Sequence, residues 1–222
     1  MTRARPASEF DAVILAGGSA ARMGGADKPG LMVGGTPLLV SVAQAAAAAG
    51  AGRLIVVGPS RPGVVTASLT MLAAGRPGWL AWVREEPAGR GPVAGLRRGL
   101  AEVSAPWLAV LAADLPFLTG AHLTALLTAD DQEPAAGVVL TDAGGRPQWL
   151  ASCWRTSSLR SALAAYDGDS LRGLLAPLSP ALASIGTPGA AMPPWLDCDT
   201  PDDLAAARSA WLANAADPGG AP

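Results

Sequence analysis

The hydrophobic positions of this chain form short, nearly continuous runs separated by longer segments with helical spacing. Runs rich in Val, Ile, Leu and Trp that end in a turn residue or a charge predict β-strands. Such runs lie at 12–16, 53–57, 79–84, 106–112, 136–140 and 149–154. Apolar residues spaced three and four positions apart predict amphipathic helices. Segments of this kind lie at 36–49, 92–103, 119–128, 157–166 and 201–213.

The predicted strands and helices alternate along the chain. Such alternation is typical of βαβ units, which assemble into a largely parallel sheet with helices on both faces. The runs 12–16 and 106–112 are almost entirely apolar, as expected of central strands covered on both sides. Thr36, Thr119 and Thr200 stand where predicted helices begin, and threonine is a preferred N-cap residue. The pattern therefore predicts an α/β fold.

Length and charge narrow the kind of protein. A chain of 222 residues can bury a sizeable core, and we expect one domain over 1–222 with an ordered core at about 10–213 and flexible ends. The net charge of −2 excludes a broad basic surface, so we expect no nucleic acid and no membrane as partner. With no leader-like or membrane-length apolar segment, the sequence predicts a cytoplasmic protein with Cys153 and Cys198 reduced.

A glycine-rich segment, "LAGGSAARMGGADKPGL", follows the first predicted strand. Its glycines would let backbone amides approach an anion closely; they are Gly17, Gly18, Gly24 and Gly25. Arg22 adds a planar fork for phosphate oxygens, and Lys28, the only lysine of the chain, adds a compact charge on a flexible stem. The spacing is neither GxGxxG nor GxxxxGK[ST]. The residues alone fit either another type of phosphate-binding loop or a solvated turn with incidental cations.

Asp114 follows the apolar run 106–112, and Pro116 stands two residues further on. Because the carboxyl ends of parallel strands meet at one edge of a sheet, this carboxylate should face the same edge as the glycine-rich segment. Mg²⁺ takes one or two carboxylates and completes its shell with water and phosphate oxygens. Asp114 could therefore start a magnesium site, or it could only cap the next turn.

Residues 15–39 resemble the signature of the nucleotidyltransferases with a nucleotide-diphospho-sugar transferase fold, LAGGxxxRMGxxDKxxL followed by GxPLL, and fill every fixed position. Within that superfamily the chain is most similar to the molybdenum cofactor guanylyltransferases, over about residues 10–210. The resemblance implies a three-layer α/β/α sandwich with a mostly parallel, twisted, Rossmann-like sheet.

The resemblance also implies roles for residues of the signature. The nucleotide would contact the start of the loop, at Leu15, Ala16, Gly17 and Gly18. Arg22 and Lys28 would contact the phosphates, and Asp114 would bind both the nucleotide and the Mg²⁺ that bridges its phosphates. Arg22, Lys28 and Asp114 are therefore the predicted catalytic residues.

A second motif of the family, an acid followed by GPxAG, resembles residues 84–100. The matching positions, predicted to bind nucleotide, are Gly91, Pro92 and Gly95. In an ungapped comparison the acid falls on Ala88, so Glu86 would have to reach across an altered turn. Gly58, after the second predicted strand, stands where the family contacts guanine, and it can offer only its backbone.

A third motif, "WLDCDTPDDLAAA" at 195–207, resembles the NTPEDL or DTPEDL segment that returns to the active site of the family. Asp199 is the predicted second metal ligand or acceptor contact, and the equal alternative is that it only caps the helix. Asp202 and Asp203 fit the first turn of a helix, which favours acids.

Other polar and aromatic residues are assigned to structure. His122, the only histidine, lies on a predicted helix away from any nucleophile motif, and the tryptophans of the strand-like runs fit core packing. Most of five arginines are expected on solvated helix faces, although one or two could meet the phosphate of an acceptor; they are Arg97, Arg98, Arg155, Arg160 and Arg172.

Together with these residues, the resemblance implies a Mg²⁺-dependent enzyme that transfers GMP from GTP to the phosphate of molybdopterin and releases pyrophosphate. Molybdoenzymes or cofactor-delivery proteins are conceivable protein partners. Two alternatives stay open: cytidylyl transfer to molybdopterin or to a sugar or polyol phosphate, and a nucleotide-binding accessory protein without catalysis. A hydrolase fits least, because the sequence shows no base positioned for water.

Overall fold

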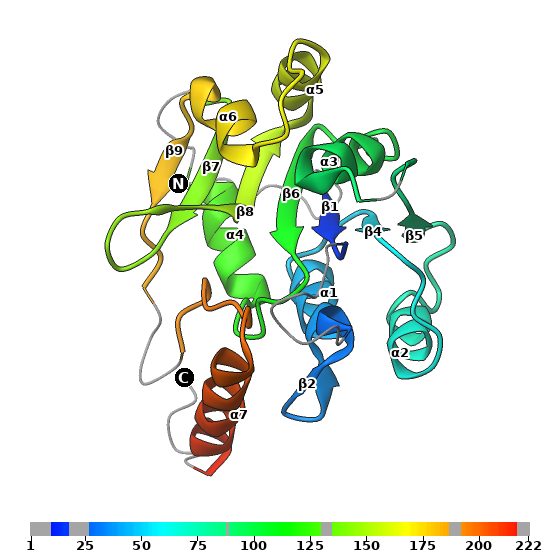
Figure 1. Cartoon of the computed structure of the whole chain (residues 1–222), viewed down its shortest axis with the longest axis vertical. Coiled ribbons are helices and arrows are strands. Elements are labelled where there is room, and N and C mark those ends of the chain that lie inside the picture. The colour runs from blue at the N-terminus through cyan, green and yellow to red at the C-terminus, as the bar shows by residue number, and fades with distance from the viewer. Residues whose placement is uncertain (1–9, 18–26, 88, 130–134, 187–191, 217–222) are drawn as a thin grey trace.

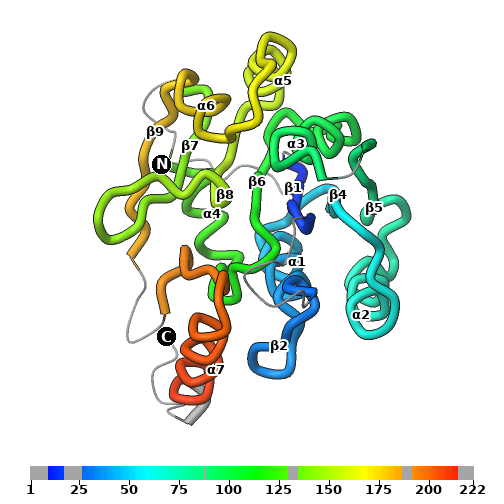
Figure 2. The backbone as a smooth tube through the Cα atoms, in the orientation of Figure 1, coloured from blue at the N-terminus to red at the C-terminus, as the bar shows by residue number. Residues whose placement is uncertain are grey.

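A seven-stranded sheet forms the centre of the molecule (Figures 1 and 2). The structure is a computed structural model that describes residues 10–17, 27–87, 89–129, 135–186 and 192–216. In spatial order the strands are β5 (Leu80–Val83), β4 (Leu54–Val57), β1 (Phe10–Leu15), β6 (Trp107–Ala112), β8 (Pro147–Arg155), β7 (Gly137–Thr141) and β9 (Ala181–Ala183). Among them only β8 runs antiparallel to its neighbours, so the predicted mostly parallel sheet is confirmed.

Helices cover both faces of the sheet, which confirms the three-layer arrangement (Figure 1). One face carries α1 (Leu38–Ala48), α2 (Val64–Leu72) and α4 (Gly120–Thr128). The other carries α3 (Gly91–Leu100), α5 (Thr156–Ala164) and α6 (Leu171–Leu175), with the 3₁₀ turn η3 (Ala176–Leu178) after α6. Side chains of a strand alternate between these layers, as on β1, where Ile14 packs with the first group and Val13 with the second.

A smaller layer lies beside the sheet. The 3₁₀ turn η2 (Lys28–Gly30) leads into a two-stranded ribbon of β2 (Met32–Val33) and β3 (Thr36–Pro37). The last helix, α7 (Pro201–Ala216), packs on this ribbon through an apolar cluster that includes Val33, Cys198 and Leu204. This packing brings the segment before α7 close to the residues that follow the glycine-rich loop.

The predicted elements are all present, with differences at their ends and between them. The helix expected from 36 begins at Leu38, because Thr36 and Pro37 form β3 and Pro37 has an extended backbone. The sequence analysis missed the ribbon, α2, α6 and β9. These elements are short, and α2 begins with two valines, which read equally well as strand.

Three of the five arginines expected on solvated faces instead tie segments together, and one of the three is Arg155, which donates to the carbonyl of Ala135 at 3.0 Å. Arg97 donates to the carbonyls of Leu163 and Tyr166, and Arg160 donates to the carbonyl of Val103 at 2.6 Å. The expected tryptophan core is confirmed at Trp79, Trp107 and Trp154, which are buried. No described helix is long and apolar enough to cross a membrane.

The predicted helix start at Thr119 is confirmed and includes the chain's only histidine. The Thr119 hydroxyl accepts from the backbone N–H of His122, and Nδ1 of His122 accepts from the backbone N–H of Thr119 at 3.1 Å. This reciprocal capping box requires an unprotonated Nδ1. Burial lowers the pKa of His122, which also favours the neutral ring.

We therefore expect acid to destabilise the protein through His122. Because its folded-state pKa lies below its ordinary value of 6.5, the unfolded chain binds the proton more readily, and stability should fall as the pH drops below about 6.5. His122→Gln keeps a capping side chain and removes the titration. Urea unfolding between pH 5 and 8 should show a smaller pH dependence in this variant; an equal dependence would contradict the assignment.

Candidate active site

The carboxyl ends of β1, β4 and β6 meet at one edge of the sheet and carry most of the predicted site residues (Figure 1). Ala16 continues the ladder beyond β1, donating its N–H to the carbonyl of Val57 at 2.8 Å. Gly58 continues β4 in the same way, donating to the carbonyl of Val83 at 2.9 Å. The predicted nucleotide-binding residues of these two strands are thus neighbours in space.

Gly58 allows an unusually close approach of two backbones. A Cβ atom on it would lie 2.7 Å from the carbonyl oxygen of Ala16 and 3.0 Å from the amide nitrogen of Gly17. The indole of Trp82 donates to the Gly58 carbonyl at 3.0 Å, so a core tryptophan also fixes this turn. Gly58 is therefore required for the shape of the site edge.

Lys28, Asp114 and Asp199 converge at this edge from three distant parts of the chain. The Lys28 ammonium forms ion pairs with Oδ2 of Asp114 and Oδ1 of Asp199. The side chains of Lys28 and Asp114 are only 18% and 14% exposed, whereas that of Asp199 is 44% exposed. Burial alone would lower the pKa of Lys28, but the hydrogen bonds and charges of the two carboxylates outweigh it and hold this pKa above its ordinary value. The lysine is thus charged and shared by both acids.

Three residues near Asp199 in the sequence, Asp197, Cys198 and Asp203, differ in their pKa values and contacts. Desolvation, followed by the charges of Asp199 and Asp114, raises the pKa of Asp197. Burial raises the pKa of the Cys198 thiol to about 12, so this cysteine is a poor nucleophile at neutral pH. Asp203 accepts from the N–H and hydroxyl of Thr200, which confirms its predicted place in the first turn of α7.

An arginine that the sequence analysis did not single out also lies at the site. Arg61 follows β4 and is 7% exposed. Its Nε donates to both carboxylate oxygens of Asp27 at 2.7 and 2.9 Å, and its Nη2 donates to the carbonyl of Ala16 at 2.7 Å. Its position in the turn four residues after the predicted strand 53–57, at the sheet edge where ligands bind, was the available signal.

Among the described residues, Glu85 is an acid that lies beside Gly17. A Cβ atom on Gly17 would lie 3.8 Å from Oε1 of Glu85, and the same oxygen accepts from the N–H of Gly89 at 3.2 Å. Glu86, the acid expected from the sequence, is exposed. The altered turn in this motif therefore brings the preceding residue to the loop.

The remaining predicted residues divide into three groups. Gly91 and Pro92 are exposed and open α3, at the same sheet edge. Gly95 is buried one turn further on and packs against Leu15 and Val57. Gly18 and Arg22 lie outside the described residues.

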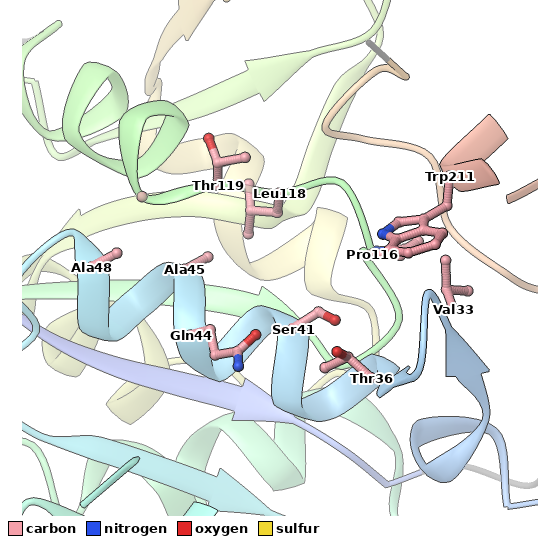
Figure 3. Close-up of a pocket in the computed structure, with 11 residues that line it drawn as sticks. Val33, Thr36, Ser41, Gln44, Ala45, Ala48, Pro116, Leu118, Thr119 and Trp211 are labelled. Carbon is pink, nitrogen blue, oxygen red and sulfur yellow. The ribbon is translucent and has the colours of Figure 1, made fainter. Parts of the chain in front are cut away.

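A separate groove of about 340 Å³ runs along α1 (Figure 3). Its other wall is the segment from Pro116 to Gly120, and Trp211 of α7 closes one end. None of the described residues that line it is charged, so these residues offer nothing to balance a triphosphate. Lys28 and its two carboxylates, rather than this groove, have the chemistry of a phosphate site.

Residues 12–183 match the family model described as MobA-like NTP transferase domain. The chain belongs to this family. The match includes Lys28, Gly58, Glu85 and Asp114 but ends before Asp199, which reaches the site through α7. The family match therefore does not cover Asp199, and only the tertiary structure places this residue beside Lys28.

Two curated relatives agree with this family, and a solved structure shares the fold. A molybdenum cofactor guanylyltransferase from Rhodopseudomonas palustris is 32% identical over 89% of this chain and 90% of its own length. A probable one from Natronomonas pharaonis is 34% identical, over 58% of this chain and 60% of the relative. A nucleotidyl transferase from Methanothermobacter shares the fold with a TM-score of 0.67 at 20% identity, over 92% of this chain and 98% of that one.

The close approach at Gly58 can be tested in this MobA-like domain. We expect Gly58→Ala to lower the free energy of unfolding by about 1–3 kcal/mol, because Ala16 and Gly17 must move to admit the methyl group. Gly186→Ala is the matched control, since a Cβ atom there would meet nothing within 4 Å. Urea unfolding of both variants measures the difference, and equal stabilities would show that the turn can relax.

Proposed function

We propose that this chain transfers GMP from GTP to the terminal phosphate of molybdopterin and releases pyrophosphate. The observation that carries the proposal is the sharing of Lys28 by Asp114 and Asp199 beside the nucleotide loop of an NTP transferase domain. The names of the curated relatives from Rhodopseudomonas and Natronomonas support guanylyl transfer for the molybdenum cofactor. Delivery of the product to molybdoenzymes or cofactor-delivery proteins stays a prediction, as do the single domain and the cytoplasmic location.

The carboxylates fit a magnesium ion. Asp114 and Asp199 already direct one oxygen each at a single cation, the Lys28 ammonium, and carboxylate oxygens are the protein ligands that Mg²⁺ prefers. When bound, Mg²⁺ would neutralise charge on the phosphates of GTP. Asp114 and Asp199 would hold it, and the flexible stem of Lys28 would let its ammonium move from the carboxylates to the phosphates.

The reaction needs little from the protein beyond positioning and charge. An oxygen of the acceptor phosphate forms a bond to the α-phosphorus of GTP, and the bond from that phosphorus to the bridging oxygen of pyrophosphate breaks. Because the acceptor is already an anion, no general base has to remove a proton. The obstacle is repulsion between anions, which Lys28, together with Arg22 of the signature, would counter.

A direct assay tests this function. Purified protein is incubated with Mg²⁺, molybdopterin and an equal mixture of GTP and CTP, and pyrophosphate and the dinucleotide product are measured. We expect the guanine product to dominate. A cytosine product would assign the chain as a cytidylyltransferase, and GTP binding without turnover would assign it as an accessory protein.

Lys28→Arg should lower turnover far more than GTP affinity. The guanidinium keeps the positive charge, but its rigid fork cannot follow the phosphates as the α-phosphorus inverts, so we expect a loss of about 100-fold in kcat. Calorimetric titration with GTP should give a similar Kd for the variant and the parent. Lys28→Met removes the charge and should lower both kcat and the affinity for GTP. An unchanged kcat in Lys28→Arg would contradict the role proposed for Lys28.

Glu85 is the candidate for recognition of the base. Guanine presents two donors, N1–H and N2–H₂, and a carboxylate is a pure acceptor that can bind both. We expect Glu85→Gln to lower kcat/KM for GTP about tenfold and to change that for CTP less. Glu86→Gln tests the acid expected from the sequence and should cause a smaller loss, since Glu86 is exposed. The opposite order of effects would return the role to Glu86.

A further inference from the structure

Arg61 is a buried charge that the chemistry above does not use. It is 7% exposed, although arginine is rarely buried without partners. Its own backbone is also fixed, because the Thr66 hydroxyl of α2 donates to the Arg61 carbonyl at 2.5 Å. The guanidinium is therefore held rigidly at the site edge.

One guanidinium contacts both ends of the glycine-rich loop. Ala16 stands before the loop and Asp27 after it, and Arg61 binds the carbonyl of the first and the carboxylate of the second. A further nitrogen of the same group, Nη1, donates to the carbonyl of Pro59 at 3.1 Å. A planar fork can direct several N–H groups at fixed angles, whereas the ammonium of a lysine cannot bridge the same set.

Each contact fixes a neighbouring group that faces the nucleotide. The carbonyl of Ala16 and the N–H of Gly17 belong to one peptide plane, so a hydrogen bond that orients the carbonyl also orients the amide. On the other side, Asp27 precedes Lys28, and the Asp27 carbonyl accepts from the N–H of Gly30 at 2.9 Å to close η2. Holding Asp27 therefore sets where the backbone of Lys28 begins.

We propose that Arg61 is a positioning residue for nucleotide binding, which sets the distance between the Gly17 amide and the backbone of Lys28 by clamping Ala16 and Asp27. The clamp rests on the proposed function only because it assumes that a nucleoside triphosphate binds at this site. It has a second, electrostatic effect, because pairing with Arg61 offsets the negative charge of Asp27 close to where the phosphates bind.

Variants of Arg61 test the clamp in the full chain. Arg61→Gln should weaken GTP binding about tenfold or more, because it loses charge-assisted hydrogen bonds to the carbonyl and the carboxylate. Arg61→Lys should not restore the affinity, since it keeps the charge but not the fork. The increase in KM for GTP should exceed the decrease in kcat, because the arginine acts on positioning before the reaction begins.

Arg53→Gln is the matched control. Arg53 directly precedes β4, at the opposite end from Gly58, and, like Arg61, it ties segments through backbone carbonyls, those of Gly78 and Glu102. Its loss should lower the melting temperature but leave the Kd for GTP within about twofold. If Arg53→Gln and Arg61→Gln lose GTP affinity equally, Arg61 has only a structural role and the proposal is overturned.

Hydrogen–deuterium exchange without nucleotide separates the clamp from the proposed function. In Arg61→Gln, peptides that contain Gly17 or Lys28 should exchange faster than in the parent, whereas peptides from β6 and β8 should not change. Unchanged exchange in the first two peptides would overturn the clamp even if guanylyl transfer is found. If the parent binds CTP but not GTP, the proposed function fails, and the same loss of affinity in Arg61→Gln, measured with CTP, still supports the clamp.

Discussion

The ion pairs of Lys28 with Asp114 and Asp199 are the interaction on which the site depends. They join a turn near the start of the chain, the end of a central strand and the segment before the last helix. A half-buried ammonium between two carboxylates is stable because the attraction between the opposite charges offsets part of the hydration that each of them loses on burial. The same arrangement keeps two carboxylate oxygens and an ammonium together at the sheet edge where we propose that the triphosphate and Mg²⁺ bind.

The sheet supplies the rigid frame for this chemistry. Parallel strands end at one edge, and the register of β1 with β4 and β6 places Ile14 beside both Val56 and Leu111. The turns beyond these residues are therefore neighbours, and Arg61 of one turn donates to the Ala16 carbonyl of the other. Gly58 then allows two of the turns to approach more closely than any other residue would permit.

Several charged side chains of the described residues hold segments of the chain together rather than face the site edge. Asp11 is buried and accepts from the N–H groups of Ser104 and Ala105, which fixes the loop before β6. Arg97 and Arg160 likewise bind backbone carbonyls. Arg61 makes contacts of the same kind, but its partners flank the nucleotide loop. What distinguishes it is therefore where its partners lie.

The sequence by itself determined the alternation of strands and helices, the glycine-rich loop and the prediction that Lys28 and Asp114 are site residues. It could do so because hydrophobic periodicity and motif spacing are local properties of the chain. The tertiary structure decided which distant groups meet. It brought Asp199 to Lys28 through the packing of α7, placed Glu85 beside Gly17 and buried Arg61 against Asp27. Such contacts depend on how the layers pack and how the turns bend. The spacing of residues along one chain therefore does not predict them.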